Sequence, residues 1–278
     1  MRITFFGVRG STPCHGHDIV RYGGNTSCVA VDVPGEPPLF FDLGTGVRNL
    51  GRTQPHDGSF RGTCLLSHLH WDHLQGLPFF TPLLRTGSIL DVYGPAQSGG
   101  VTVEDAVRGA ISPPVFPVGL DAFPGSVRFH DLADADFELG AVHVMARLVP
   151  HLGPTLGYRV EWNGRSVAYL SDHQQPHDGS FRVADGARAL AEGADLLIHD
   201  AQFTPDEFAA KREWGHCTMQ YAAWLAAECG VRTLALFHHD PSRTDDALDE
   251  AHREIARSMG DDGLTVVTAR EGLTIDLS

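Results

Sequence analysis

The sequence predicts a mixed α/β fold, because short apolar runs typical of strands open each half of the chain and helical patterns intervene. The 278 residues are 42% hydrophobic, 20% charged and 9% aromatic, so they can bury a sizeable core. A chain of this length forms one large domain or two small ones. Disordered chains contain fewer apolar residues, and this composition excludes that class.

The first half of the chain reads mainly as strands and turns. We expect strands at residues 2–6, 26–33, 38–42 and 63–67, each ending at a turn or, in the last case, at a run of histidines. The segment 94–125 is rich in glycine and proline. We expect a long flap there rather than a linker between domains, because loops of that length inside a compact chain are usually functional.

The second half repeats the pattern and adds helices. We expect strands at residues 142–149, 155–162, 166–171, 196–199 and 233–237, helices at 186–192, 218–228 and 245–259, and a terminal hairpin at 264–277. The helix at 218–228 has apolar residues at helical spacing, which predicts one buried face. The octapeptide QPHDGSFR occurs at 54–61 and again at 175–182, and we interpret it as a coincidence in two surface turns.

Charge and cysteine usage narrow the class of protein. The formal net charge is −14, so broad binding to nucleic acid is not favoured, although it is not excluded. Five scattered cysteines form no C-x-x-C pair, which predicts free thiols and a reducing cytoplasm. The sequence has no run of 18 apolar residues and no signal-peptide pattern at its start, so we expect no membrane segment.

The strongest motif is SHLHWDHLQG, which contributes His68, His70, Asp72 and His73 directly after an apolar strand. Side chains at the carboxyl end of a strand can converge on a cleft, and His68 and His70 alternate so that both can point to one side. Imidazole and carboxylate are the usual ligands of zinc, and four of them in six residues predict the beginning of a two-metal site.

This run resembles the first metal motif of the metallo-β-lactamase fold. The family has one histidine after a later strand (His151 in LVPHLG), a bridging carboxylate (Asp172 in AYLSDH), a last histidine (His238 in LALFHHDP, with His239 as the alternative) and an early aspartate (Asp42 in FFDLGTG). The resemblance covers essentially the whole chain and implies one domain, an αββα sandwich with the metals between its two sheet edges. His173 and His199 are expected to be core or supporting residues.

The resemblance also implies two divalent ions, Zn or Mn. One ion is expected on His68, His70 and His151, the other on Asp72, His73 and His238, with Asp172 bridging them. Asp72 is then expected to serve catalysis as well as metal binding.

Two further segments resemble the ribonuclease Z-like phosphodiesterase branch. They are GHCTMQYAAW, which contains His216, and LLIHDAQF, in which Asp200 stands where the branch usually has glutamate. The resemblance implies that His216 protonates the leaving oxygen and that the acidic residue orients it. Asp200 is one methylene shorter than glutamate. The opening segment also resembles this branch, and Arg9, Arg21 and Asn25 are expected to contact phosphate, with an ordinary structural turn as the alternative.

The expected activity is hydrolysis of a small phosphodiester such as a cyclic nucleotide. Ribonuclease Z itself binds tRNA through a basic inserted arm, and we find no lysine- and arginine-rich insertion in this chain. The alternatives are a tRNA 3′-processing endonuclease, a lactone or thioester hydrolase, and a non-catalytic metal-binding regulatory protein. Relatives are often dimers, so a homodimer is also considered.

Overall fold

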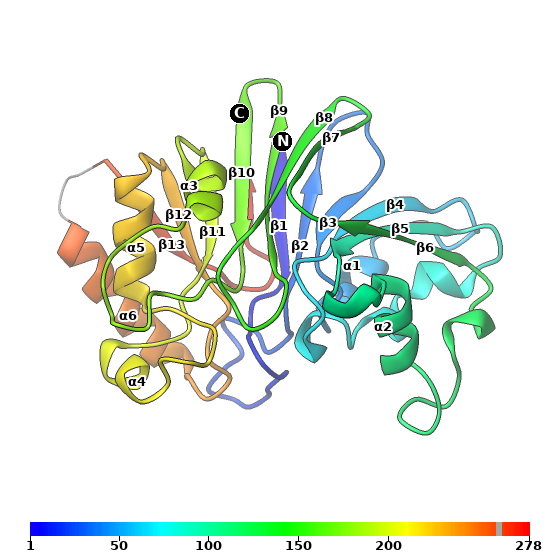
Figure 1. Cartoon of the computed structure of the whole chain (residues 1–278), viewed down its shortest axis with the longest axis horizontal. Helices are drawn as coiled ribbons and strands as arrows, with labels where there is room; N and C mark the ends of the chain where they lie inside the picture. Colours follow the sequence, from blue (N-terminus) through cyan, green and yellow to red (C-terminus); the bar gives the residue numbers. More distant parts are fainter. Residues whose placement is uncertain (260–262) are drawn as a thin grey trace.

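Two mixed β-sheets face each other in the computed structural model, which describes residues 1–259 and 263–278 (Figure 1). The first sheet has the order β14-β1-β2-β3-β4-β5-β6 among the described residues. Its strands are β1 (Arg2–Gly7), β2 (Cys28–Asp32), β3 (Leu39–Phe41), β4 (Arg61–Leu65), β5 (Ile89–Pro95), β6 (Ser126–Leu132) and β14 (Thr274–Asp276).

The second sheet has the order β13-β12-β11-β10-β9-β8-β7 in the same part of the chain. Its strands are β7 (Ala135–Leu139), β8 (Val142–Leu148), β9 (Leu156–Trp162), β10 (Arg165–Leu170), β11 (Leu196–Asp200), β12 (Thr233–Phe237) and β13 (Thr265–Thr268). Strands β10 to β13 pair in parallel, so their carboxyl ends meet at one edge of the sandwich.

Helices cover the outer face of each sheet, which confirms the expected αββα sandwich (Figure 1). On the second sheet lie α3 (Asp185–Ala191), α5 (Met219–Glu228) and α6 (Asp245–Met259). On the first sheet lie α1 (Val47–Gly51) and α2 (Val103–Ala110), and α4 (Pro205–Ala210) lies in the loop before α5. As the sequence predicts, α5 buries Met219, Ala222, Ala223 and Ala226.

Aromatic and branched side chains from both sheets form the central core. Phe5, Phe41, Tyr158, Tyr169 and Phe237 are all fully buried there. The rings of Phe41 and Tyr169 stack with centroids 4.4 Å apart, one from each sheet. Stacked aromatic pairs hold the two layers at a fixed distance and orientation, which fixes the strand ends that carry the site.

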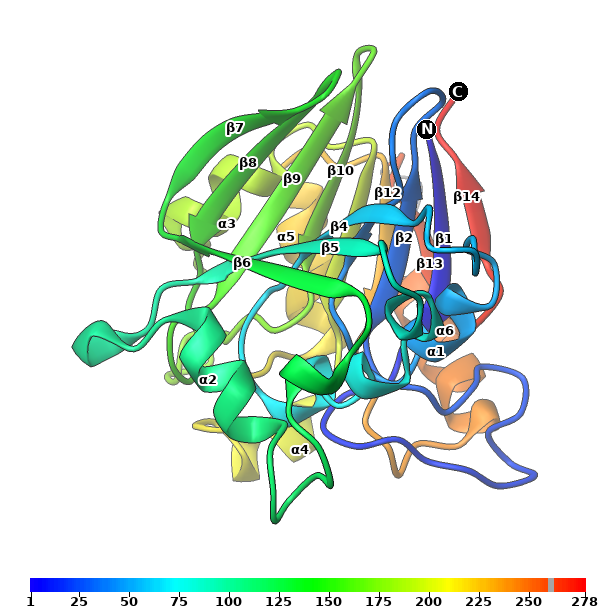
Figure 2. The ribbon, with the colours of Figure 1, turned by 90° about the vertical axis from the view of Figure 1, so that its right-hand side faces the viewer.

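The expected hairpin at 264–277 is wrong. β13 pairs with β12 in the second sheet, whereas β14 pairs with β1 in the first. The segment therefore crosses from one sheet to the other, and the two termini lie side by side (Figure 2). Two short strand patterns close together could not reveal which sheet each would join.

The segment 94–125 also differs from the expected flap, because it contains the helix α2. Thr102 and Asp105 form a capping box at its start, and Val103 and Val107 are buried against the first sheet. The segment thus covers the sheet over part of its length. Glycines and prolines on both sides of the helix obscured its short apolar face.

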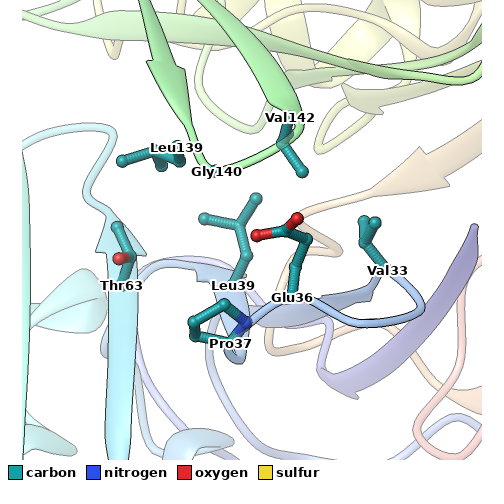
Figure 3. A pocket seen from close by; sticks show the side chains of 8 residues that line it. All are labelled: Val33, Glu36, Pro37, Leu39, Thr63, Leu139, Gly140 and Val142. Atoms are coloured by element: carbon teal, nitrogen blue, oxygen red, sulfur yellow. The ribbon is translucent and has the colours of Figure 1, made fainter.

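The two ends of the sandwich differ in character. At one end a cavity of about 230 Å³ lies between the β2–β3 turn and the β7–β8 turn, and most of its lining is apolar (Figure 3). Histidines and carboxylates gather at the opposite end, where β3, β4, β10, β11 and β12 terminate. Within the described residues, no helix is both long and apolar enough to cross a membrane.

Candidate metal centre and its surroundings

The candidate site lies where strands from both sheets end. His68, Asp72 and His73 follow β4, His151 follows β8, Asp172 follows β10, and His238 follows β12. Each element ends in the same cleft because the parallel strands run toward it. Their ring and carboxylate atoms fall into groups in which all ligand atoms lie within 4.8 Å of one another.

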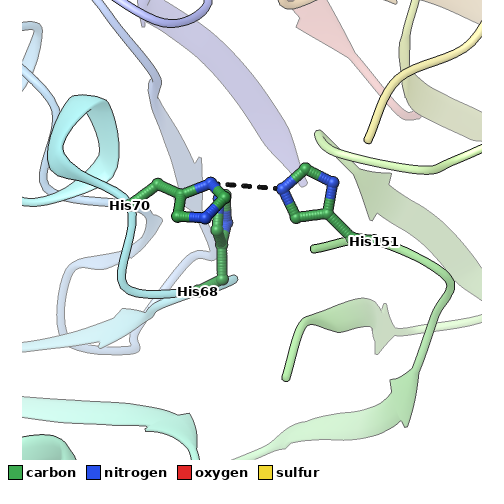
Figure 4. A group of neighbouring side chains, drawn as sticks. All are labelled: His68, His70 and His151. Atoms are coloured by element: carbon green, nitrogen blue, oxygen red, sulfur yellow. Dashed lines mark hydrogen bonds between the residues drawn. The ribbon is translucent and has the colours of Figure 1, made fainter. Parts of the chain in front are cut away.

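The outer group consists of His68, His70 and His151 (Figure 4). His70 Nδ1 lies 3.2 Å from His151 Nε2, although 81 residues separate them in the chain. His151 Nδ1 donates to the carbonyl of Gly215 at 2.6 Å, so its Nε2 carries the free lone pair. Burial lowers the pKa of all three imidazoles, that of His151 to about 4, which keeps them neutral as metal ligands must be.

The inner group consists of Asp72, His73 and His238, all buried. Nε2 of His73 and Nε2 of His238 lie 3.3 Å apart, and each lies within 3.3 Å of Asp72 Oδ2. Burial by itself would lower the pKa of His73 and of His238, but the neighbouring carboxylates outweigh it and raise both pKa values. The inner group therefore attracts positive charge.

Asp172 faces both groups. Its Oδ1 lies 3.8 Å from His68 Nε2 and 3.7 Å from His151 Nε2, in the outer group. Its Oδ2 lies 3.2 Å from His73 Nε2 and 3.4 Å from His238 Nε2, in the inner group. Burial would raise the pKa of this carboxyl, but His238, His73 and His68 hold it well below its usual range. The carboxylate thus occupies the position expected for a bridge.

The donor set fits divalent metal ions. Among the described residues, Nε2 of His68 and Oδ2 of Asp172 are buried yet have no hydrogen-bond partner. Buried polar atoms left without a partner are costly, and a cation at their meeting point would satisfy them. Imidazole nitrogens and carboxylate oxygens are also the ligands that such ions prefer.

Asp42 holds His73 of the inner group in place by a hydrogen bond to the nitrogen that faces away from the cluster. His73 Nδ1 donates to Asp42 Oδ2 at 2.7 Å, and the hydroxyl of Tyr169 donates to the same oxygen at 2.6 Å. The backbone N–H of Ser67 donates to Asp42 Oδ1 at 2.7 Å. A carboxylate on the far nitrogen of a ligating histidine fixes the ring and makes it more basic. The sequence offered no signal for Tyr169 or Ser67 beyond their nearness to the motifs.

His216 lies beside the cluster and is held by Asp200. Its Nδ1 donates to Asp200 Oδ2 at 2.6 Å, so the shorter aspartate arm does reach it. The His216 ring lies 5.1 Å from that of His238 and 5.5 Å from that of His151. Thr218, two residues later, caps α5 and so fixes the chain direction at this point.

A family model described as a beta-lactamase superfamily domain matches residues 44–239, more than half of the chain. The chain belongs to the beta-lactamase superfamily. An uncharacterized protein of Mycobacterium tuberculosis is 30% identical, over 91% of this chain and 86% of its own length. A ribonuclease Z of Prochlorococcus marinus is 28% identical, over 87% of each chain.

Among solved structures, the metallo-beta-lactamase fold protein YhfI from Bacillus subtilis superposes with a TM-score of 0.73 at 20% identity. The alignment covers 99% of this chain and 98% of YhfI. The superfamily membership, the ribonuclease Z relatives and the His/Asp cluster identify a ribonuclease Z-like, metal-dependent hydrolase of the metallo-β-lactamase fold.

Of the two adjacent histidines, His238 lies in the cluster and His239 does not. His238 has a left-handed backbone (φ 56°), and Gln202 Oε1 accepts from its Nδ1 at 3.0 Å. His239 Nε2 donates to the carbonyl of Ala269 at 2.8 Å, away from the cluster. A Cβ on Gly10 would lie 2.4 Å from the His238 ring, so the glycine of the opening segment is required for this close approach.

Arg9, Arg21 and Asn25 have other partners than the expected phosphate. The fully buried Arg9 guanidinium donates to the carbonyls of Gly23, Asp240 and Arg243. Arg21 pairs with Asp246 and Asp249 on α6, and Asn25 donates its side-chain amide to Glu271. The alternative of a structural turn therefore describes these three side chains better, because most of their donors are used within the fold, although Arg9 Nη2 has no hydrogen-bond partner among the described residues.

The same opening segment does reach the cluster, through its backbone. The N–H of Ser11 donates to Asp72 Oδ2 at 2.7 Å, with Ser11 in a left-handed conformation (φ 61°). Ser11 and Gln202 both contact candidate ligands, and sequence reasoning missed both. Ser11 stands in the GVRGSTP segment and Gln202 in HDAQF, so the motifs contained them without showing their roles.

Proposed function

We propose that this hydrolase cleaves small phosphodiesters, cyclic nucleotides included, with two divalent ions and with His216 as general acid. The observation that carries the proposal is the His216–Asp200 pair, which lies against the candidate ligands without belonging to the outer or inner group. A hydrolase that only activates water does not need a further imidazole, beyond the metal ligands, that is placed to donate a proton. A phosphodiesterase does, because its alkoxide leaving group needs a proton.

The ligand set supports two ions rather than one. Seven side chains exceed what one tetrahedral ion accepts, and Asp172 offers one oxygen to each group. Two divalent ions, when bound, would neutralise charge on the phosphodiester and make water a better nucleophile. The outer group would hold one ion and the inner group the other, and the donors suit Zn or Mn equally.

His216 would hold the proton that the leaving oxygen needs. Its Nδ1–H is committed to the carboxylate of Asp200, so a proton on Nε2 is the one available for transfer. The carboxylate fixes the ring orientation and stabilises the imidazolium, as in other His–Asp pairs. Asp200 is itself held in place, since its Oδ1 accepts from the N–H of Gln202 at 3.1 Å.

The surroundings of the cluster favour a substrate with an aromatic group. Trp71, Leu152 and Trp214 are each about half exposed, and each lies within two residues of a cluster residue or of His216. Exposed apolar side chains beside a site offer a binding surface, and a nucleobase is a flat group that stacks on such side chains. Lys211 Nζ lies 5.3 Å from the Trp214 ring centroid, and its charge is paired with Asp240 at 3.7 Å.

Processing of tRNA is the second candidate, and the 28% identity to a ribonuclease Z favours it. Binding to tRNA requires neutralisation of many phosphates. A net charge of −14 works against this, so we rank the small substrate first.

The decisive experiment compares two substrates in the His216→Ala variant. Turnover of a cyclic nucleotide, which has an alkoxide leaving group, should fall roughly 10²–10⁴-fold. Turnover of bis(p-nitrophenyl) phosphate should fall far less, since p-nitrophenolate leaves without a proton. Asp200→Ala should show the same contrast more weakly.

Metal analysis of the same variant is the control, because His216 could itself be a metal ligand. Its ligand atom lies within 4.8 Å of those of Asp172, Asp200 and His238. Loss of metal from His216→Ala would make it a ligand. Equal slowing of both substrates with metal retained would assign it to phosphate positioning. Efficient cleavage of precursor tRNA by the unaltered protein, without turnover of cyclic nucleotides, would reverse the ranking of the two candidates.

A further inference from the structure

The cavity of about 230 Å³ lies at the end of the sandwich opposite the metal centre, and most of its lining is aliphatic (Figure 3). The β2–β3 side contributes Val33, Pro37 and Leu39, and the β7–β8 side contributes Leu139 and Val142. Among the described residues, no aromatic ring lines it. The lining therefore suits an aliphatic group, which gains free energy from burial without needing a ring to stack on.

One carboxylate lies within this aliphatic lining. Glu36 belongs to the β2–β3 turn, and its side chain points toward the β7–β8 turn (Figure 3). Its Oε1 accepts from the backbone N–H of Ala141 at 3.0 Å. A Cβ on Gly140 would collide with Glu36 Oε2, so a glycine is required where the carboxylate lies against the turn. These contacts with the second sheet fix the position of the carboxylate beside the cavity.

The Glu36 carboxylate can accept further hydrogen bonds. A carboxylate has about four lone-pair sites, and the N–H of Ala141 uses one of them. Thr63 adds a hydroxyl to the same lining, which is also able to accept. Both side chains are partly exposed, so a molecule in the cavity can reach them. A ligand group with several donors would use both acceptors.

The charge around the cavity favours a cation. Glu36 carries a negative charge, and the lining contains no lysine, arginine or histidine to balance it. A charge next to apolar side chains is stabilised by a partner of opposite sign. The net charge of −14 also attracts small cations to the protein as a whole.

We propose that this cavity binds a small aliphatic monoamine as its ammonium ion, with the ammonium group on Glu36 and Thr63 and the hydrocarbon chain against the aliphatic lining. An ammonium is compact and has three donors, which suits these two acceptors. The cavity is smaller than the roughly 300–1,000 Å³ of sites for drug-sized ligands, so a short chain fits it best. The site uses no residue of the metal centre and is independent of the proposed phosphodiesterase activity.

Three probes with the same hydrocarbon chain test the choice of head group. Hexylamine is an ammonium ion at neutral pH, because its pKa lies near that of lysine, about 10.4. Hexanol is neutral and hexanoate is negative. Calorimetric titration of the full-length protein should show hexylammonium binding roughly tenfold more tightly than hexanol, since hydrogen bonds between charged groups are stronger than neutral ones. Hexanoate should not bind.

Methyl resonances of the unaltered protein locate the ligand. Val33, Leu39 and Val142 line the cavity, and their methyl resonances should move on addition of hexylammonium. Val47 and Val107 are buried under the helices of the first sheet, and their resonances should not move. An amine can also bind a metal ion, and this measurement distinguishes the cavity from the metal centre.

Two glutamate variants of matched size test the carboxylate. Glu36→Gln keeps an oxygen that can accept from Ala141 but removes the charge. It should lower the affinity for hexylammonium roughly tenfold and leave the affinity for hexanol unchanged. Glu138→Gln removes the same charge from a side chain that is 63% exposed on β7 and does not line the cavity, and it should leave both affinities unchanged.

Equal affinity for hexylammonium and hexanol, or a preference that survives in Glu36→Gln, would overturn the proposed role of the carboxylate. Binding that leaves the resonances of Val33, Leu39 and Val142 unmoved would overturn the proposed location. Binding of none of the probes at millimolar concentration would overturn the proposal as a whole. Each of these results would leave the proposed phosphodiesterase activity unaffected, because that activity depends on the metal centre.

Discussion

The outer and inner groups of the metal centre use similar ligands in very different settings. The outer group has three neutral histidines, of which His70 is exposed and His151 is partly exposed. The inner group contains a carboxylate, is fully buried, and raises the pKa of its own histidines. A divalent ion gains more from an anionic, preorganised site than from a neutral and partly solvated one. The inner position should therefore bind its ion more tightly.

The support behind each group differs in the same direction. His73 of the inner group donates to Asp42, which Tyr169 and Ser67 hold from the other side. His151 of the outer group donates only to a backbone carbonyl, that of Gly215. A charged partner makes the ligating nitrogen more basic than a neutral one does. The hydrogen-bond partners of the histidines therefore also favour tighter metal binding at the inner group.

The largest effect should follow from removal of the one side chain that the two groups share. Asp172→Ala should reduce turnover by roughly 10³–10⁴-fold, since a carboxylate that bridged two ions would contribute several kcal/mol to their stabilisation. His238→Ala, which alters the inner group alone, should reduce it by roughly 10²-fold. Turnover of an aryl phosphodiester, measured with metal content, gives the comparison.

The two variants must first be shown to fold, by near-ultraviolet circular dichroism and a melting curve. With folding intact, losses that are equal or in the reverse order would mean that Asp172 does not bridge.

Removal of metal should show directly that the two groups differ in metal affinity. During titration with a chelator, the first ion should leave at a lower chelator concentration than the second. His70→Ala should weaken only the first ion to leave, whereas His73→Ala should reduce the occupancy of both, by roughly tenfold to a hundredfold in affinity. Release of both ions together in the unaltered protein would contradict the difference between the groups.

The sequence predicted the side chains that gather in both groups but not the difference in burial and charge between the groups. Four of these side chains lie in one short motif, and the others follow strands whose apolar pattern is plain, so His68 to His238 could be found. Tyr169 reaches Asp42 across the space between the sheets, a contact of residues 127 positions apart that no local pattern encodes. The segment 264–277 likewise joins two different sheets, and only tertiary pairing decides that.

The repeated octapeptide shows the same limit. In both copies of QPHDGSFR the serine N–H donates to the aspartate at 2.9 Å, so the two copies share this local contact. Phe60 is nevertheless 1% exposed in the core beside Phe80, and Phe181 is 43% exposed beside Tyr221. Local sequence determines the turn, and the surrounding fold determines whether its phenylalanine is buried. Both turns lie at the surface as expected, since Asp57 and Asp178 are exposed, and the copies differ in the burial of the phenylalanine that follows.

The smallest expected effect concerns Tyr169, and Tyr158 provides its control. Both tyrosines are fully buried and both rings pack on Phe41, but their hydroxyls differ in partner. Tyr169 donates to Asp42, whereas Tyr158 donates to the carbonyl of Leu66 at 2.7 Å. Replacement by phenylalanine removes one buried hydrogen bond in each case and should cost about 1 kcal/mol of unfolding free energy.

Only Tyr169→Phe should also weaken the inner ion, by about tenfold, because Asp42 would lose one of the donors that hold it against His73. Tyr158→Phe should leave both ions unchanged. Chelator titration of the two variants at equal folded fraction measures the difference. If both variants lose the inner ion equally, its tighter binding comes from core packing in general, and Asp42 does not transmit the support of Tyr169 to the metal centre.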